Sequence, residues 1–160
     1  MTRLFSTDRH SSILLAQRLV LALVMIPHGA QKLLGWFGGY GFSGTMAFFT
    51  DTMHLPAPLA LLVILGESFG PVLLALGLFS RVSAFGISAI MLGAIATTHA
   101  QHGFFMNWFG AQGGEGFEYH LLALALSIPL TIAGGGRYAL DTWLAERLGR
   151  LPRPREAVAA

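Results

Sequence analysis

Long apolar runs separated by short polar stretches dominate the sequence. A transmembrane helix needs about 20 mostly apolar residues to cross a hydrocarbon core of about 30 Å. The apolar runs reach that length in four places, and no fifth run follows them. The pattern therefore predicts an all-α membrane protein, a four-transmembrane-helix bundle with helices at about 13–34, 58–79, 82–100 and 117–133.

These windows divide the chain into three parts. Residues 1–12 are predicted to form a cytoplasmic N-terminal segment, and residues 13–136 the four-helix transmembrane domain. Residues 137–160 are predicted to form a cytoplasmic tail, in which a short amphipathic helix precedes a disordered end containing proline and arginine. A cleaved signal peptide is an alternative for the first run, but Arg18 interrupts it and no convincing small-residue cleavage site follows.

Arginines mark one side of the predicted bundle. Arg3 and Arg9 precede the first window, Arg81 occupies the turn between the second and third, and further arginines follow the fourth. Cytoplasmic segments of membrane proteins carry an excess of Lys and Arg, so both termini are predicted to be cytoplasmic. The other two loops contain Asp51 and Glu115 and no arginine, and are predicted to face outward from a bacterial cytoplasmic (inner) membrane.

Composition agrees with a membrane location and excludes several functions. The chain is 54% hydrophobic and 11% charged, whereas soluble domains have about 25% charged residues. Its ten Lys and Arg residues gather at the predicted cytoplasmic ends, so they indicate topology and not a nucleic-acid surface. The absence of cysteine excludes disulfides, thiolate metal ligands and thiol chemistry in this chain.

Both outer loops are long and rich in glycine and aromatic residues. The first contains Trp36, Phe37 and Tyr40, which are residue types typical of a membrane interface. Ser43 is expected to cap a short helix lying along the membrane surface. The second outer loop, GFFMNWFG and its surroundings, has the same character. The two loops are expected to form aromatic flaps over the outer end of the bundle.

Ionisable side chains inside the apolar windows are the candidate functional residues. A charge at the centre of a spanning helix costs roughly 2.5 to 3.5 kcal/mol, so such residues normally face the bundle interior and have partners. Glu67 lies about 14 Å from the outer end of its window, near mid-membrane. His28 and Lys32 lie one turn apart, and Glu67 is their expected counterpart. The predicted outer-half pocket contains His28, Lys32, Glu67, His99 and Glu118.

Other residues in the windows are interpreted as structural. Pro27 and Pro71 each remove a helical hydrogen bond and are expected to kink their helices. Gly66 and Gly70 form a G-x-x-x-G pattern that lets another helix approach closely, and Arg81 is expected to set orientation. A structural role for His28 and Glu67 also stays open. The chain shows no strongly spaced metal-ligand set, so no metal site is predicted.

Four stretches of the chain resemble a known family. They are PHGAQKLLGWFGGYGFSGTMAFF, ILGESFGPVLLALGLFSR, HAQHGFF and GGGRYALD, and the resemblance runs from about Gln17 to Asp141. The family is DoxX, small bacterial membrane proteins with four predicted helices. Some relatives are described as membrane subunits associated with thiosulfate:quinone oxidoreduction, and others as parts of oxidoreductase assemblies in oxidative-stress defence. The resemblance implies a role for His28, Lys32, Glu67, Arg81, His99 and Glu118.

The expected function is a membrane oxidoreductase component that binds a quinone or a similar lipophilic molecule in the outer-half pocket. A quinone head group needs hydrogen-bond donors at its carbonyls and a proton route, which His28, Lys32 and Glu67 could supply. The expected partners are the lipid bilayer and a redox protein, with no covalent cofactor. Whether the chain is itself an enzyme stays open.

Two other functions stay open from the sequence. The pocket could instead serve a transport module for a small solute, a lipid or a proton, because intramembrane acids often form proton relays. Four helices are few for a carrier, so that function would require a homo-oligomer. The third alternative is a noncatalytic membrane scaffold, in which the polar residues only hold helices together.

Overall fold

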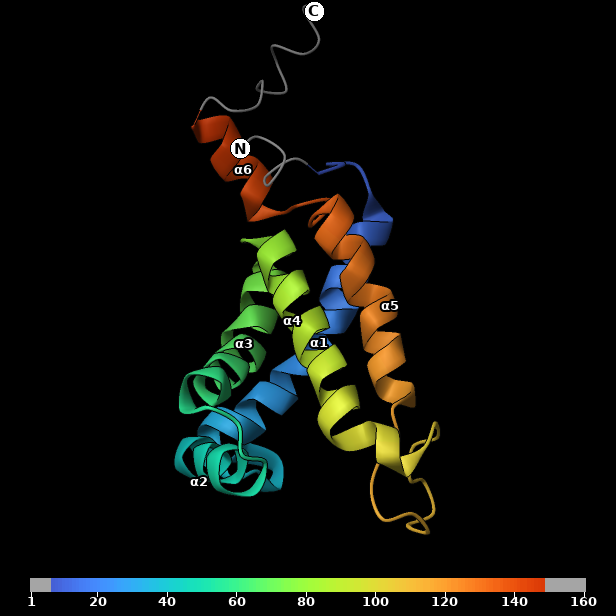
Figure 1. The fold of residues 1–160 in the computed structure, drawn as a ribbon. Coiled ribbons are helices and arrows are strands. Elements are labelled where there is room, and N and C mark those ends of the chain that lie inside the picture. Colours follow the sequence, from blue (N-terminus) through green and yellow to red (C-terminus); the bar gives the residue numbers. More distant parts are fainter. Residues whose placement is uncertain (1–6, 149–160) are drawn as a thin grey trace, which may run out of the picture.

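Helices form every regular element of residues 7–148, the part of the chain that the computed structural model describes. The four long helices pack as a bundle in which α1 and α4 each contact both α3 and α5 (Figure 1). The predicted all-α bundle is therefore confirmed. Residues 1–6 and 149–160, including the predicted disordered end of the tail, lie outside the described residues. The long helices are α1 Ser12–Leu34, α3 Ala57–Leu76, α4 Ser80–Ala94 and α5 Glu118–Ala133.

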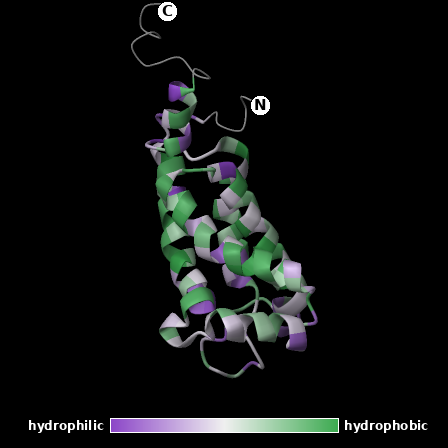
Figure 2. Ribbon diagram, turned by 90° about the vertical axis from the view of Figure 1, so that its left-hand side faces the viewer, coloured by the Kyte–Doolittle hydropathy of each residue, from purple (hydrophilic) through white to green (hydrophobic). Residues whose placement is uncertain are grey.

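The lengths and compositions of these helices match a membrane protein. Within residues 7–148, three helical stretches are long and apolar enough to cross a membrane, namely α1, α3, and α4 with its continuation to His102. Helix α5 is apolar but has 16 residues, about 24 Å at 1.5 Å per residue. Hydrophobic residues cover most of the length of the helices (Figure 2), as expected for a surface that faces lipid.

The turn between α3 and α4 lies earlier in the chain than predicted, at residues 77–79 and not at 80–81. Helix α3 ends at Leu76 because Gly77 adopts a left-handed conformation, with φ of 68°, which glycine adopts at little cost. Helix α4 already begins at Ser80, so Arg81 lies in its first turn and not in a loop. Two short segments continue α4 outward. The first is the wider, π-helical η4 Ile95–His99, and the second is the tighter, 3₁₀ η5 Ala100–His102.

A cap of short helices closes the outer end between α1 and α3. It consists of η2 Trp36–Gly38, α2 Gly41–Ala47 and the π-helical segment η3 Phe48–Thr52 (Figure 1, below α1). The predicted cap by Ser43 is wrong, because Ser43 lies inside α2 and Tyr40 precedes the helix.

The C-terminal helix α6 Leu140–Arg147 ties the chain ends together at the opposite, inner end. The Asp141 carboxylate accepts hydrogen bonds from the backbone amides of Phe79 at 2.7 Å and Ser80 at 2.8 Å, so it caps the start of α4. We call this arrangement the inner latch. The Gly136 amide donates to the Thr7 hydroxyl at 2.8 Å. Both described ends therefore lie at one end of the bundle (Figure 1); the membrane side that they face stays a prediction.

Helices α1 and α3 are in close backbone contact at a glycine that the G-x-x-x-G pattern did not include. A Cβ added to Gly29 would lie 2.3 Å from the carbonyl oxygen of Glu67, so only glycine fits there. The expected close approach at Gly66 and Gly70 is not found. A Cβ at Gly66 would meet only the end of the Ile90 side chain, and one at Gly70 would meet nothing within 4 Å.

Prolines lie inside three of the long helices, Pro27 in α1, Pro71 in α3 and Pro129 in α5. Figure 1 shows α1 changing direction along its length. A bend of this kind is expected where an interior proline removes a backbone hydrogen bond. The bend carries the outer part of α1 across α3, where Gly29 allows close contact.

Candidate functional site

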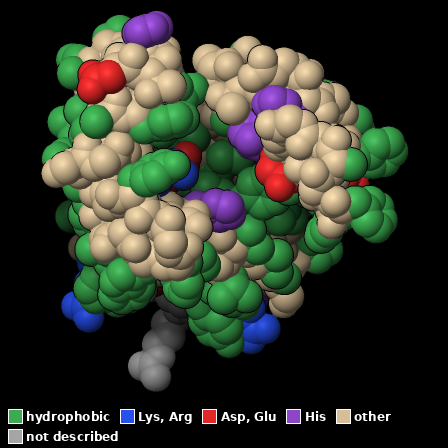
Figure 3. Space-filling view, turned by 90° about the horizontal axis from the view of Figure 1, so that it is seen from below, with side chains coloured by type: hydrophobic (Ala, Val, Ile, Leu, Met, Phe, Trp, Pro, Cys, Tyr) green, Lys and Arg blue, Asp and Glu red, His purple; other side chains and the backbone are tan. Residues whose placement is uncertain are grey.

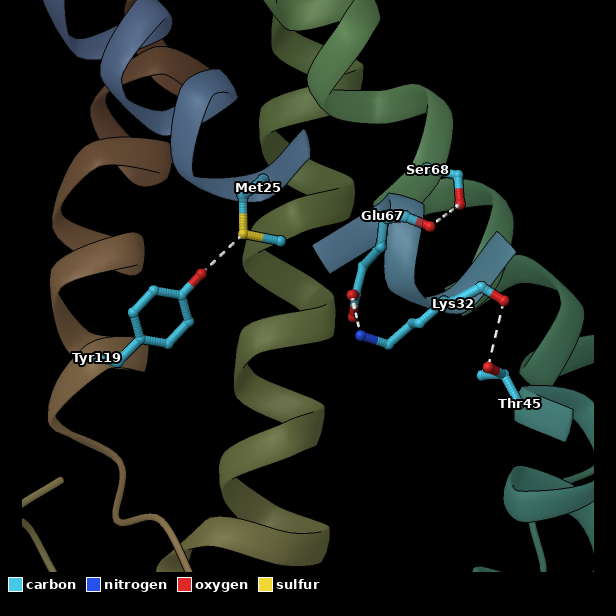
Figure 4. Close-up of polar contacts among 7 residues, drawn as sticks. Met25, Lys32, Thr45, Glu67, Ser68 and Tyr119 are labelled. Carbon is cyan, nitrogen blue, oxygen red and sulfur yellow. Dashed lines mark hydrogen bonds and ion pairs between the residues drawn. The ribbon is translucent and has the colours of Figure 1, made fainter. Parts of the chain in front are cut away.

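A buried ion pair joins α1 to α3 in the outer half of the bundle. The Lys32 ammonium lies 2.5 Å from a carboxylate oxygen of Glu67 (Figure 4). The Glu67 side chain is 7% exposed, whereas that of Lys32 is 24% exposed. The carboxylate is therefore enclosed by protein, and the ammonium retains some contact with its surroundings. Such a pair persists in a low-dielectric setting because neither charge is left without its counterpart.

Neighbouring hydrogen bonds fix the crossing that forms this pair. The Ser68 hydroxyl donates to the Gly29 carbonyl oxygen at 3.2 Å, beside the close approach of the two backbones. The Thr45 hydroxyl of α2 donates to the Lys32 carbonyl oxygen, also at 3.2 Å (Figure 4). The Lys32 carbonyl lies in the last turn of α1, where a helix leaves its carbonyls without a backbone partner of its own. The Lys32 backbone is thus held from α2 while its side chain reaches Glu67.

The outer end of the molecule is hollowed. Figure 3, seen from that end, shows acidic and basic side chains in the depth of the hollow and histidine side chains along its sides. Hydrophobic side chains make up much of the remaining wall. A mostly apolar concavity with a few converging polar groups is the usual form of a small-molecule site.

Tyr119 is a second polar group near the ion pair, and sequence reasoning did not single it out. Its ring lies against that of His28, with centroids 5.4 Å apart. Its hydroxyl donates to the sulfur of Met25 at 3.1 Å, which links α5 to α1 (Figure 4). A tyrosine beside the end of a spanning window is an ordinary interface residue, so nothing in the sequence distinguished this one.

Two further histidines continue the row of rings towards the outer loops. The rings of His99 and His120 lie with centroids 4.1 Å apart, and His120 also packs edge-on against Tyr119. His120 is 6% exposed, and its Nδ1 atom has no hydrogen-bond partner. The His99 Nδ1 donates to the Glu115 carbonyl oxygen at 2.8 Å. Sequence reasoning placed His99 in the candidate set but omitted the more deeply buried His120.

The predicted set of five residues therefore divides into two groups. Lys32 and Glu67 meet at the crossing of α1 and α3, with His28 one helical turn from Lys32. The row of rings connects His28 to His99. Glu118 instead holds the outer loop, because its carboxylate accepts a hydrogen bond from the Met106 amide at 3.3 Å. Within residues 7–148, no three His, Asp or Glu side chains gather as a metal site would require.

Arg81 lies at the other end of the bundle, away from this site. Its guanidinium donates to the carbonyl oxygens of Thr131, at 3.0 Å, and of Ile132. These carbonyls belong to the last turn of α5, where a cation also interacts favourably with the helix dipole. Arg81 thus satisfies a helix end, in addition to the orientation role that its position in the sequence suggests.

A bundle of apolar helices with a buried ion pair beneath an outer hollow defines a small multi-pass membrane protein. The profile of the DoxX family matches residues 13–100, more than half of the 160-residue chain. The chain belongs to the DoxX family. The matched region contains His28, Lys32, Glu67 and His99, whereas Tyr119 and His120 lie beyond it. Comparisons with curated proteins and with solved structures gave no match.

Proposed function

We propose that the chain is the quinone-binding component of a membrane oxidoreductase in the bacterial inner membrane. The observation that supports this most is the Lys32–Glu67 pair, which combines an enclosed carboxylate with a partly accessible ammonium in the outer half of the bundle. A lipophilic ring compound could enter the hollow and present a carbonyl oxygen to Lys32. The mostly apolar walls suit the ring, and the ammonium suits the oxygen.

The residues around the pair also suit the protons of quinone chemistry. Reduction of a quinone to a quinol takes up two electrons and two protons. In this proposal the electrons come from a partner protein or a soluble donor, and no covalent cofactor is involved. The Glu67 carboxylate lies at the pair and the His28 imidazole lies one helical turn from Lys32, so these two groups could exchange protons with the bound ring.

Quinone binding can be tested with the protein in lipid nanodiscs. Equilibrium dialysis against menadione would measure the bound quinone, with empty nanodiscs as the blank for partition into lipid. We expect Lys32→Met and Glu67→Gln to lower the affinity about tenfold or more, because each removes a charge-assisted contact or its support. The matched control, Glu146→Gln, makes the same chemical change at the inner end, where Glu146 pairs with Arg9, and should bind like wild type. Binding by the wild-type protein no greater than that of empty nanodiscs would overturn the proposal.

Proton transport is the second candidate function, favoured by the row of rings. His28, Tyr119, His120 and His99 run in sequence from the ion pair towards the outer loops. Proteoliposomes with an interior pH dye, examined with and without a pH gradient, would test it. A proton flux above that of empty liposomes, abolished in Glu67→Gln, would support transport, and equal fluxes would exclude it.

A further inference from the structure

The Tyr119 hydroxyl has an unusual hydrogen-bond acceptor, the thioether sulfur of Met25. The phenol donates to the Met25 sulfur at 3.1 Å, and Met25 is buried among the core residues of the bundle. A thioether is a weak acceptor, whereas a buried tyrosine hydroxyl usually finds an oxygen. The contact therefore satisfies the hydroxyl only in part and leaves it available to a stronger acceptor.

The position of this hydroxyl relates it to the ion pair. Tyr119 packs against the ring of His28, which lies one helical turn from Lys32. In Figure 4 the Tyr119 hydroxyl and the Lys32 ammonium both point towards the middle of the view, one from α5 and the other from α1. Two donors from different helices thus flank one region.

We propose that Tyr119 is the second hydrogen-bond donor of the site, and that its ligand is a lipophilic ring compound with two oxygen acceptors. One oxygen is held by Lys32, and the other receives the Tyr119 hydroxyl in exchange for the Met25 sulfur. This inference rests on the proposed function and specifies its substrate class, since 1,4-quinones carry two such oxygens. The Met25 side chain remains as an apolar contact for the ring.

Ligand binding is favoured because the Tyr119 hydroxyl exchanges the Met25 sulfur for an oxygen of the ligand. A hydroxyl already satisfied by an oxygen would gain little from a ligand carbonyl, because one good hydrogen bond would replace another. Replacement of sulfur by oxygen strengthens the bond, and the free protein still avoids an unpaired buried donor. The same arrangement lowers the affinity for ring compounds with one oxygen, because the Tyr119 hydroxyl would then stay hydrogen-bonded to the Met25 sulfur.

Two variants with opposite expected effects test this inference. Tyr119→Phe keeps the aromatic ring and removes the hydroxyl, so it should lower the affinity for menadione about five- to tenfold. Its affinity for α-tetralone, a ring compound with a single carbonyl, should equal that of wild type. Met25→Leu keeps an apolar side chain but removes the competing sulfur, so it should raise the affinity for menadione. Equilibrium dialysis in nanodiscs measures these three affinities, and circular dichroism checks that each of the two variants is folded.

Infrared spectroscopy gives a readout that a packing effect would not produce. Menadione labelled with ¹³C at either carbonyl lets each C=O stretch be observed separately. In the wild-type protein both stretches should lie below their values in an apolar solvent, because both oxygens accept hydrogen bonds. In Tyr119→Phe one stretch should return towards the solvent value while the other stays shifted.

The outcomes separate the failure of this inference from the failure of the proposed function. Absence of menadione binding by the wild-type protein would overturn both. Menadione binding that is sensitive to Lys32→Met but unchanged in Tyr119→Phe, with both carbonyl stretches still shifted, would overturn the inference alone. An equal loss of affinity for menadione and α-tetralone in both Tyr119→Phe and Met25→Leu would show that the two side chains only pack, and would also overturn it.

Discussion

At the scale of single residues, the Lys32–Glu67 pair is held between two different environments. The carboxylate is enclosed where α1 crosses α3, and the ammonium reaches it from the more open side. Removal of one member of an enclosed pair leaves the other charge without compensation, which costs more than the net contribution of the pair itself. Replacing one member of the pair is therefore expected to lower the stability of the protein more than replacing both members.

The stability of single and double variants can test this. We expect Lys32→Met to lower the free energy of unfolding by about 2 kcal/mol, less than for a fully enclosed pair because Lys32 is partly exposed. The double variant Lys32→Met/Glu67→Gln should recover part of that loss. Thermal unfolding in detergent, followed by circular dichroism, measures both. A double variant less stable than Lys32→Met would contradict the expectation, and a loss of stability without any loss of menadione binding would favour the scaffold function.

Sequence reasoning found the residues of the site whose chemistry conflicts with an apolar window. His28, Lys32 and Glu67 stood out because ionisable groups are costly in lipid. In the structure Lys32 pairs with Glu67, and His28 lies one turn away on α1. Tyr119 and His120 did not stand out, since both types are common near helix ends. Their importance comes from contacts such as that between Tyr119 and Met25, 94 positions apart in the chain. Such distant pairs leave no local pattern.

At the scale of elements, the crossing of α1 and α3 depends on one glycine. The absence of a Cβ at Gly29 lets the α3 backbone at Glu67 and Ser68 come into contact with α1. The apolar windows predicted both helices, but the G-x-x-x-G pattern pointed to the wrong glycines for this contact. A spacing rule reports which residues share a face of one helix and does not identify what that face meets.

Alanine substitution separates the two kinds of glycine. Gly29→Ala would place a methyl group within 2.6 Å of two α3 backbone atoms, so it should destabilise the protein by about 2 to 3 kcal/mol and weaken menadione binding. Gly70→Ala meets no atom within 4 Å and should be neutral or more stable by up to about 1 kcal/mol, because alanine favours helix. Unfolding curves and dialysis of both variants check this; equal stabilities would show that α1 and α3 are not in close contact there.

The start of α4 depends on a side chain far along the chain. Asp141 satisfies the amides of Phe79 and Ser80 in a buried position, so Asp141→Ala should lower the free energy of unfolding by about 1 to 2 kcal/mol. The control Asp51→Ala removes an exposed acid of the outer cap and should change stability little. Thermal unfolding of both variants measures the difference. Menadione affinity should stay unchanged in Asp141→Ala, since the inner latch lies at the opposite end from the hollow.

At the scale of the whole molecule, the two ends of the bundle differ in construction. The inner end is tied by the latch, by the Thr7–Gly136 hydrogen bond and by the Arg9–Glu146 ion pair at 2.8 Å. The outer end is hollowed and covered by short helices and aromatic loops. Hydropathy and charge were enough to predict the bundle, but the ties at the inner end join residues more than sixty positions apart and follow no periodic pattern.

The sidedness of the two ends can be measured directly because the chain contains no cysteine. Ala111→Cys, in the exposed second outer loop, should react with a membrane-impermeant maleimide in intact bacterial spheroplasts. Leu148→Cys, at the exposed end of the described tail, should react only after the membrane is permeabilised. The reverse labelling would show that the positive-inside assignment is wrong.

The inner latch also has a consequence for how the protein is made. The amides of Phe79 and Ser80 leave the ribosome some sixty residues before the carboxylate that caps them, and α4 enters the membrane during that interval with its first turn unsatisfied. A nascent chain arrested just before Asp141 would contain all four apolar helices and still lack the carboxylate that caps the start of α4. The start of α4 can therefore reach its final form only after Asp141 has been made, and a chain truncated before Asp141 should insert but remain a better substrate for quality-control proteases.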